Sequence, residues 1–205
     1  MKTIIFDFDG TIADSLELVI EIYRQLTGDT RPLTGEEREA LRKLPAQKVM
    51  KSLGVPMWRA PFLLRRGRKI MHSRVSEVEV FSGLPDILKA LQERGYTMRI
   101  VTSNSENNVR VFLRKYGLES YFTDITGNIG LFNKSKVLKQ IVKREKLDSH
   151  QTFYIGDEAR DIAASKKAGL PIISVTWGYN DISLLEKLQP YALAKNPGDL
   201  LEIFP

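Results

Sequence analysis

Near its start the chain carries the segment TIIFDFDGT, residues 3–11. Residues 3–8 are mostly apolar and rich in β-branched side chains, which is typical of a buried strand. Asp9-Gly10 then signals a tight turn. Two aspartates, Asp7 and Asp9, lie where the strand ends. We therefore expect chemistry at this turn.

Beyond residue 81 the chain alternates between helical and strand patterns. Pro85 suits the first turn of a helix and Gly95 its C-terminal end. The predicted elements that follow are strand 98–102, helix 105–116, helix 135–146, strand 152–155, helix 158–167 and strand 171–175. Such alternation predicts an α/β protein with a doubly wound, Rossmann-like parallel sheet, whose ligands bind at the carboxyl ends of the strands.

Residues 15–81 interrupt this alternation with helical patterns alone. Apolar residues recur there at helical spacing, and the predicted helices run from about 16 to 27, 36 to 43, 46 to 53 and 58 to 75. We therefore predict a small helical cap domain, residues 15–81, inserted after the first strand. The α/β core domain is then formed by residues 1–14 and 82–205.

Composition narrows the class of protein. The 205 residues, 42% of them hydrophobic, suffice for one full core and a smaller subdomain. The absence of cysteine excludes a disulfide framework and favours a cytoplasmic location. No apolar run of about 18 residues occurs, so we expect no membrane insertion. The net charge of +6 suits an anionic partner, either a phosphorylated metabolite or a nucleic acid.

Four groups of polar residues fall at the predicted strand ends, which converge in such a sheet. They are Asp7/Asp9/Thr11, Ser103/Asn104, Lys134 and Asp157/Asp161. Several carboxylates in one crevice raise one another's pKa unless a cation lies among them, so a divalent cation is implied. Oxygen ligands, with no cysteine and no histidine nearby, favour Mg²⁺ over zinc.

The same residues carry a resemblance to a known family. Residues 6–11, FDFDGT, resemble the first motif of the haloacid dehalogenase-like hydrolases, and residues 100–104, IVTSN, resemble the second. Lys134 resembles the third motif and residues 156–161, GDEARD, the fourth. The segments GLP at 83–85 and WGY at 177–179 are similar to phosphoglycolate phosphatase-like members, as is the helical insertion.

This resemblance implies a magnesium-dependent phosphatase that forms an aspartyl-phosphate. Asp7 would be the nucleophile that attacks phosphorus, and Asp9 the general acid and base. Asp9 separates phosphatases from dehalogenases, because a halide leaves without a proton and an alkoxide needs one. Thr11 is expected either to orient Asp9 near the substrate or to be a turn residue only.

The other motifs imply phosphoryl and metal contacts. Ser103, and less firmly Asn104, would bind the phosphoryl group, the alternative for Ser103 being a helix cap shared with Ser105. Lys134 would neutralise charge on Asp7 and on the phosphoryl group; Lys136 is a rival, and Lys134 is favoured because it is expected just before the helix.

The metal ligands implied are Asp7, Asp9, Asp157 and Asp161. Asp161 would act through water or pair with Lys134. Glu158 is expected to stabilise a helix N-terminus.

Three other functions stay open. A sugar phosphomutase shares all the core motifs, and a phosphoacceptor receiver-type signalling domain shares the clustered aspartates, although it needs neither a cap nor Asp9. A nucleic-acid-binding protein is motivated only by basic residues in the predicted cap: Arg65, Arg66, Arg68 and Lys69. We expect these to be a solvated face. The alternative is that one or two of them contact an acidic group of the substrate, which would suit a phosphoglycolate-like acid. The expected partner is a small phosphorylated metabolite, bound by a monomer or a homodimer.

Overall fold

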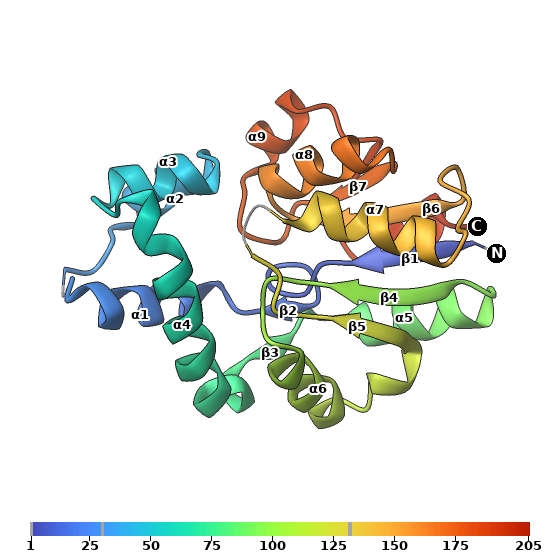
Figure 1. Cartoon of the computed structure of the whole chain (residues 1–205), viewed down its shortest axis with the longest axis horizontal. Helices are drawn as coiled ribbons and strands as arrows, with labels where there is room; N and C mark the ends of the chain where they lie inside the picture. The colour runs from blue at the N-terminus through green and yellow to red at the C-terminus, as the bar shows by residue number, and fades with distance from the viewer. Residues whose placement is uncertain (1, 30, 131–132) are drawn as a thin grey trace.

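The computed structural model describes residues 2–29, 31–130 and 133–205. Its centre is a six-stranded parallel sheet in the order β5-β4-β1-β6-β7-β8 (Figure 1). The strands are β1 (Thr3–Phe6), β4 (Thr97–Val101), β5 (Phe122–Thr126), β6 (Thr152–Gly156), β7 (Ile172–Val175) and β8 (Ala192–Ala194). The predicted α/β fold with a parallel sheet is confirmed.

Helices cover both faces of this sheet. They are α5 (Leu84–Glu93), α6 (Glu106–Lys115), α7 (Lys134–Arg144), α8 (Ala159–Ala168), α9 (Ile182–Lys187) and α10 (Asp199–Ile203). Successive residues of β1 point to opposite faces, as a strand requires. Ile4 and Phe6 join a core with residues of α5, α6 and α10, whereas Ile5 joins a core with residues of α7, α8 and α9. Because both of its faces are buried, β1 is apolar throughout.

The segment between β1 and α5 is mainly helical and lies to one side of the sheet (Figure 1). It contains α1 (Leu16–Thr27), α2 (Gly35–Arg42), α3 (Ala46–Ser52) and α4 (Ala60–Arg74), with short 3₁₀ turns η1 (Met57–Arg59) and η2 (Val75–Glu77). Helix α1 ends at Gly28, whose left-handed conformation stops the helix. Helix α2 begins at a capping box formed by Thr34 and Glu37. Helices α1 and α4 pack against each other.

The two connections of this helical segment pair with each other. Strand β2 (Ala13–Asp14) runs antiparallel to β3 (Glu79–Val80), and the N–H of Phe81 donates to the carbonyl of Ile12 at 3.2 Å. The prediction that residues 15–81 are helical throughout is therefore wrong for residues 79–80. A two-residue strand has no sequence pattern of its own, since only its partner defines it.

Other differences concern the edges of the sheet and the ends of β1. The sequence analysis did not predict strands β5 and β8 or helices α9 and α10. Strands β5 and β8 are the two outermost strands of the sheet, where side chains can face solvent and the apolar pattern is weaker. Strand β1 ends at Phe6, two residues earlier than expected, because the carbonyl of Phe8 accepts the N–H groups of Thr11, Ile12 and Ala13. A tight loop thus begins directly after Asp7.

Candidate active site

The first and fourth motifs lie side by side because β1 pairs with β6. The N–H of Asp7 donates to the carbonyl of Ile155 at 2.8 Å, so Asp7 and Asp157 leave neighbouring strands at the same edge of the sheet. Gly10 makes this approach feasible. It has a φ of 74°, and a Cβ there would lie 2.2 Å from Asp157 Oδ2. Only glycine fits at that point of the loop.

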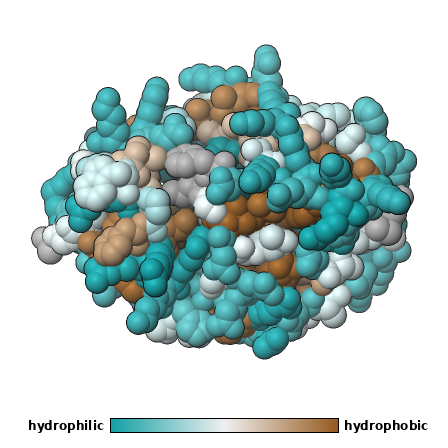
Figure 2. Space-filling model, viewed as in Figure 1, coloured by the Kyte–Doolittle hydropathy of each residue, from teal (hydrophilic) through white to brown (hydrophobic). Residues whose placement is uncertain are grey.

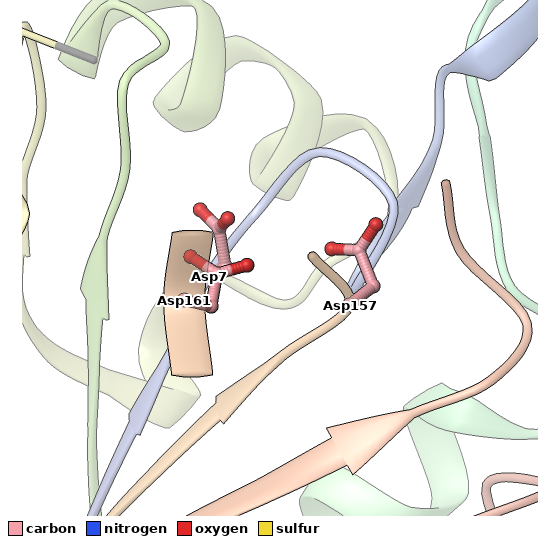
Figure 3. Close-up of side chains that lie close together, drawn as sticks. All are labelled: Asp7, Asp157 and Asp161. Carbon is pink, nitrogen blue, oxygen red and sulfur yellow. The ribbon is translucent and has the colours of Figure 1, made fainter. Parts of the chain in front are cut away.

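Three carboxylates meet at this edge (Figure 3). One oxygen each of Asp7, Asp157 and Asp161 lies within 4.8 Å of the others, and all three side chains are buried. Asp161 reaches the group from α8, directly after the loop that carries Asp157. Burial raises the pKa of Asp157 well above its ordinary value, with further contributions from Glu158, Asp161 and Asp7. Burial also raises the pKa of Asp7, although Lys134 opposes this.

This donor set fits a hard divalent cation. It offers only oxygen atoms, the carboxylates are close enough to share one ion, and bringing three carboxylates together is costly without a cation among them. Asp7, Asp157 and Asp161 are the residues that would hold the metal. The Asp9 side chain, predicted as a fourth ligand, lies outside this group and is held by other partners.

Lys134 supplies the positive charge in this cluster. Its Nζ donates to Asp7 Oδ2 at 2.7 Å and to Asp161 Oδ1 at 2.6 Å, and the side chain is 5% exposed. Lys136 is exposed, so the geometry favours Lys134 over its rival. The reason given from the sequence was wrong, however, because Lys134 is the first residue of α7 rather than the residue before it.

Thr11 and Tyr179 position Asp157. The Thr11 hydroxyl donates to Asp157 Oδ1 at 2.8 Å, and the backbone N–H of Tyr179 donates to Oδ2 at 2.7 Å. The prediction that Thr11 orients Asp9 is wrong, since its hydroxyl is directed to the fourth motif. Gly178 lets the Tyr179 loop approach, because a Cβ there would lie 2.3 Å from the Cβ of Asp157.

Asp9 is held by side chains outside the carboxylate group. Ser15 Oγ donates to Asp9 Oδ1 at 2.9 Å, and Asn104 Nδ2 donates to Oδ2 at 3.0 Å. Burial, reinforced by the charge of Asp7, raises the pKa of Asp9 to about 6, and the bonds from Ser15 and Asn104 limit the rise. A carboxyl group with a pKa near neutrality is suited to giving and taking protons.

The second motif contributes Asn104, which contacts Asp9, and Ser103, whose hydroxyl has no hydrogen bond to another described residue. Asn104 donates to Asp9, while its own Oδ1 accepts from the N–H of Ser105 and from Asn108. Ser105, not Ser103, caps α6, because its hydroxyl accepts from the N–H of Asn108. This removes the capping alternative for Ser103, which is 8% exposed and lines the pocket described next.

A pocket of about 250 Å³ opens above Asp9, between the helical segment and the sheet edge. Its lining residues are Asp9, Val19, Ile22, Tyr23, Leu26, Met50, Ala60, Leu63, Leu64, Gly67, Arg68, Met71, Ser103, Asn104, Arg160 and Tyr179. The polar members come mainly from the sheet edge and the apolar ones from α1, α3 and α4. Asp9 is thus the aspartate that a molecule in this pocket would meet.

Sequence reasoning missed Arg160 and did not single out Arg68 from the basic residues of the predicted cap. Arg160 pairs with Glu158, its Nε donating to Glu158 Oε1 at 2.8 Å, and within the described residues its buried Nη1 has no hydrogen-bond partner. Arg68 of α4 donates to the carbonyls of Ser103 at 2.6 Å and Ile129 at 2.8 Å. Arg160 stands inside the fourth motif, so its position was a usable signal. Arg68 could be singled out from its basic neighbours only in three dimensions.

Glu158 is the N-terminal cap of α8, as predicted.

These motifs, on this fold, are matched by the sequence model of the haloacid dehalogenase-like hydrolases over residues 4–175. The chain belongs to this family, and it is an enzyme of the hydrolase class. It is 33% identical over 204 residues to a phosphoglycolate phosphatase of Synechococcus elongatus, an alignment that covers 98% of this chain and 96% of that protein.

Two solved structures share the fold. A haloacid dehalogenase-like family protein from Streptococcus pneumoniae has a TM-score of 0.82 at 21% identity, covering 100% of this chain and 99% of that one. Protein Tyrosine Kinase A of Mycobacterium tuberculosis has a TM-score of 0.77 at 22% identity, covering 98% and 97%. One of these proteins is named a hydrolase and the other a tyrosine kinase, although they share a fold. The activity of this chain therefore has to be argued from its site.

Proposed function

We propose that the protein is a Mg²⁺-dependent phosphatase that hydrolyses a small phosphomonoester through an aspartyl-phosphate on Asp7. The observation that carries the proposal is the arrangement of Asp7 at 2.7 Å from Lys134 and within 4.8 Å of two further carboxylates. A nucleophilic carboxylate beside a lysine and a metal-binding group is suited to attack on phosphorus. Family membership and the phosphatase relative support the same reaction.

In the first step, a carboxylate oxygen of Asp7 attacks phosphorus and the bond to the leaving oxygen breaks. Lys134 offsets the negative charge that gathers on Asp7 and on the phosphoryl oxygens. Ser103, at the end of β4 and with its hydroxyl not used for capping, is proposed to donate to a phosphoryl oxygen. When bound, Mg²⁺ supplies charge neutralisation and orients the phosphoryl group.

Asp9 is proposed as the general acid of this first step and the general base of the second. Its pKa of about 6 leaves part of the population protonated near neutrality, so it can protonate the leaving alkoxide. The same carboxylate then takes a proton from the water that hydrolyses the aspartyl-phosphate. Asn104 and Ser15 hold it in place, and Thr11 holds Asp157.

Residues 15–81 are proposed to act as a cap over this site, with residues 1–14 and 82–205 as the core domain. The paired connections β2 and β3, together with Gly83 at a φ of 79°, support a hinge in which both strands bend together. A cap keeps water from the aspartyl-phosphate until the leaving group has gone.

The partner is proposed to be a small phosphorylated metabolite, and phosphoglycolate is the compound to test first because a relative is named for it. Within the described residues no helix is long and apolar enough to cross a bilayer. A cytoplasmic location and a monomeric or homodimeric state remain predictions from composition. A phosphomutase would also form the aspartyl-phosphate in its first step. A receiver domain would form it and then not hydrolyse it with turnover.

The test is release of inorganic phosphate from a panel of phosphomonoesters with Mg²⁺. Many turnovers per protein support the phosphatase. A single turnover would indicate a receiver, and transfer of the phosphoryl group to a second sugar hydroxyl without phosphate release would indicate a mutase. Phosphate release that persists in Asp7→Asn would contradict the proposed nucleophile.

A further inference from the structure

The pocket above Asp9 has a polar floor and apolar walls. Asp9, Ser103, Asn104 and Arg160 form the floor, and the walls come from the helical segment, with Val19 and Ile22 of α1, Met50 of α3 and Leu63, Leu64 and Met71 of α4. In the view of Figure 2, hydrophobic residues show between hydrophilic ones at several places, over both the helical segment and the core. The chemistry proposed above needs the floor but does not need walls of this kind.

Most of the wall residues come from the apolar faces of helices α1 and α4. Val19, Ile22, Tyr23 and Leu26 follow helical spacing on α1, and Ala60, Leu63, Leu64, Gly67 and Met71 do so on α4. Two such faces normally interdigitate, and α1 and α4 do pack against each other. Beside that contact their apolar residues, with Met50 of α3, line an open pocket of about 250 Å³ that leads to Asp9. Apolar surface kept beside a reactive carboxyl group indicates that a ligand covers it.

Two arginines line this pocket, and both are anchored by hydrogen bonds. Arg68 donates to two backbone carbonyls, and burial lowers its pKa. Arg160 lies at the floor, where its Nε donates to Glu158; within the described residues its buried Nη1 has no hydrogen-bond partner. Arg65, Arg66 and Lys69 are exposed, and none is among the described residues that line the pocket. A carboxylate carried several carbons from the ester oxygen would lie beyond this floor and would lose its water against apolar walls.

We propose that this pocket binds the leaving group of the substrate, and that this leaving group is an uncharged, largely apolar alcohol, either alkyl or aryl. The inference rests on the proposed phosphatase function and narrows its substrate class. A second cavity of about 230 Å³ shares Val19, Tyr23 and Met50 with the pocket, but Arg31, Arg38 and Arg42 also line it, so the proposal concerns the first pocket alone. The volume of about 250 Å³ in that pocket leaves room for an alcohol of several carbons.

The test compares matched phosphomonoesters with Mg²⁺ and the whole chain. Hexyl phosphate and 5-carboxypentyl phosphate have leaving groups of nearly equal acidity, because the carboxylate is five carbons from the ester oxygen. We expect kcat/KM to favour hexyl phosphate by at least about tenfold. We also expect a rise of about threefold to fourfold for each methylene added between propyl and hexyl phosphate. Equal values for the matched pair, or a preference for the carboxylated ester or for phosphoglycolate, would overturn the inference.

A charge placed on the wall should reverse the preference. Leu64→Arg is expected to lower kcat/KM for hexyl phosphate and raise it for the carboxylated ester. Phe62→Arg is the matched control, since Phe62 lies on the same helix, is 52% exposed and is not among the lining residues; it should leave the ratio unchanged. Leu64→Gln, with folding checked by thermal melting, replaces the arginine variant if that one does not fold. An unchanged ratio in a folded Leu64 variant would contradict the proposal.

Arg160 gives a further control. In our proposal Arg160→Ala lowers kcat/KM for both esters by the same factor, because Arg160 lies at the floor, which both esters share. A loss confined to the carboxylated ester would show that Arg160 reads that carboxylate, and would overturn the inference. Failure of the proposed function is a separate outcome: no phosphate would be released from any ester, phenyl phosphate included.

Discussion

The floor and the walls of the pocket differ in both origin and chemistry. The floor lies at the carboxyl ends of the strands and at the start of α8, beside the buried group in which Lys134 donates to Asp7 and Asp161. The walls come from helices of residues 15–81 and are apolar. A buried charged group is stable only with its partners in place, so the floor tolerates little change. Apolar walls of similar volume can be exchanged at lower cost. We infer that the floor residues take part in the reaction and that the wall residues select the leaving group.

The largest expected effect comes from changing the proposed nucleophile, Asp7. Asp7→Asn keeps the shape of the side chain but removes the attacking oxygen's charge, so we expect kcat to fall by about 10⁴-fold or more for every ester. Phosphate release measured at saturating substrate checks it. Asp86→Asn makes the same chemical change at an exposed position of α5 and should have no effect. A loss smaller than tenfold in Asp7→Asn would place the nucleophile elsewhere.

Removal of the metal should come next in size. A chelator is expected to abolish activity and Mg²⁺ to restore it, because three buried carboxylates with raised pKa values in two of them need a cation beside them. Ca²⁺ should support the reaction poorly, since its longer and more variable bonds misplace the phosphoryl group. Phosphate release in metal-titrated samples measures this. Full activity in the chelator would contradict the metal requirement.

Asp9 lies at the floor, where the leaving group is proposed to bind. The loss of activity when Asp9 is replaced should therefore depend on the ester. Asp9→Asn is expected to lower kcat/KM for alkyl phosphates by about 10²-fold or more, because an alkoxide needs a proton to leave. Aryl phosphates with acidic leaving groups should lose less in the first step. A ratio of the two kcat/KM values that stays at its wild-type level would argue against the general acid.

The Thr11 hydroxyl tests whether the support of a metal ligand matters. Thr11→Val removes the hydrogen bond to Asp157 and should raise the Mg²⁺ concentration needed for half-maximal activity by about 10-fold to 100-fold. Thr11→Ser keeps the hydroxyl and serves as the control, with a change of less than about threefold. Metal titrations of the two variants give the answer. Identical titration curves would mean that Asp157 is positioned by the Tyr179 N–H alone.

The smallest expected effect is a shift in pH dependence. Asn104 donates to the ionised Asp9 and so lowers its pKa; Asn104→Ala should therefore raise it above about 6. Because the acid form acts first, activity on alkyl phosphates falls as pH rises through this pKa, and the fall should begin at higher pH in the variant. The pH profile of kcat/KM measures the shift. A shift to lower pH would contradict the assigned hydrogen bond.

Part of this site could be predicted from sequence because its residues lie next to strand ends. Asp7 follows β1 and Asp157 follows β6, and parallel strands bring their carboxyl ends to one edge whatever the details of packing. The direction of each side chain could not be predicted. Thr11 is two residues from Asp9, yet it donates to Asp157, because the loop closes on itself through the carbonyl of Phe8.

The amino-acid sequence by itself thus determined the strand–helix alternation, the helical insertion, the family and the residues gathered at the sheet edge. These follow from local periodicity and from motifs that are contiguous in the chain. Only the tertiary structure decided that Lys134 rather than Lys136 contacts Asp7, that residues 13–14 pair with 79–80, and that Arg68 turns inward while Arg65 and Arg66 stay exposed. Each of these depends on contacts between segments far apart in sequence, which no local pattern records.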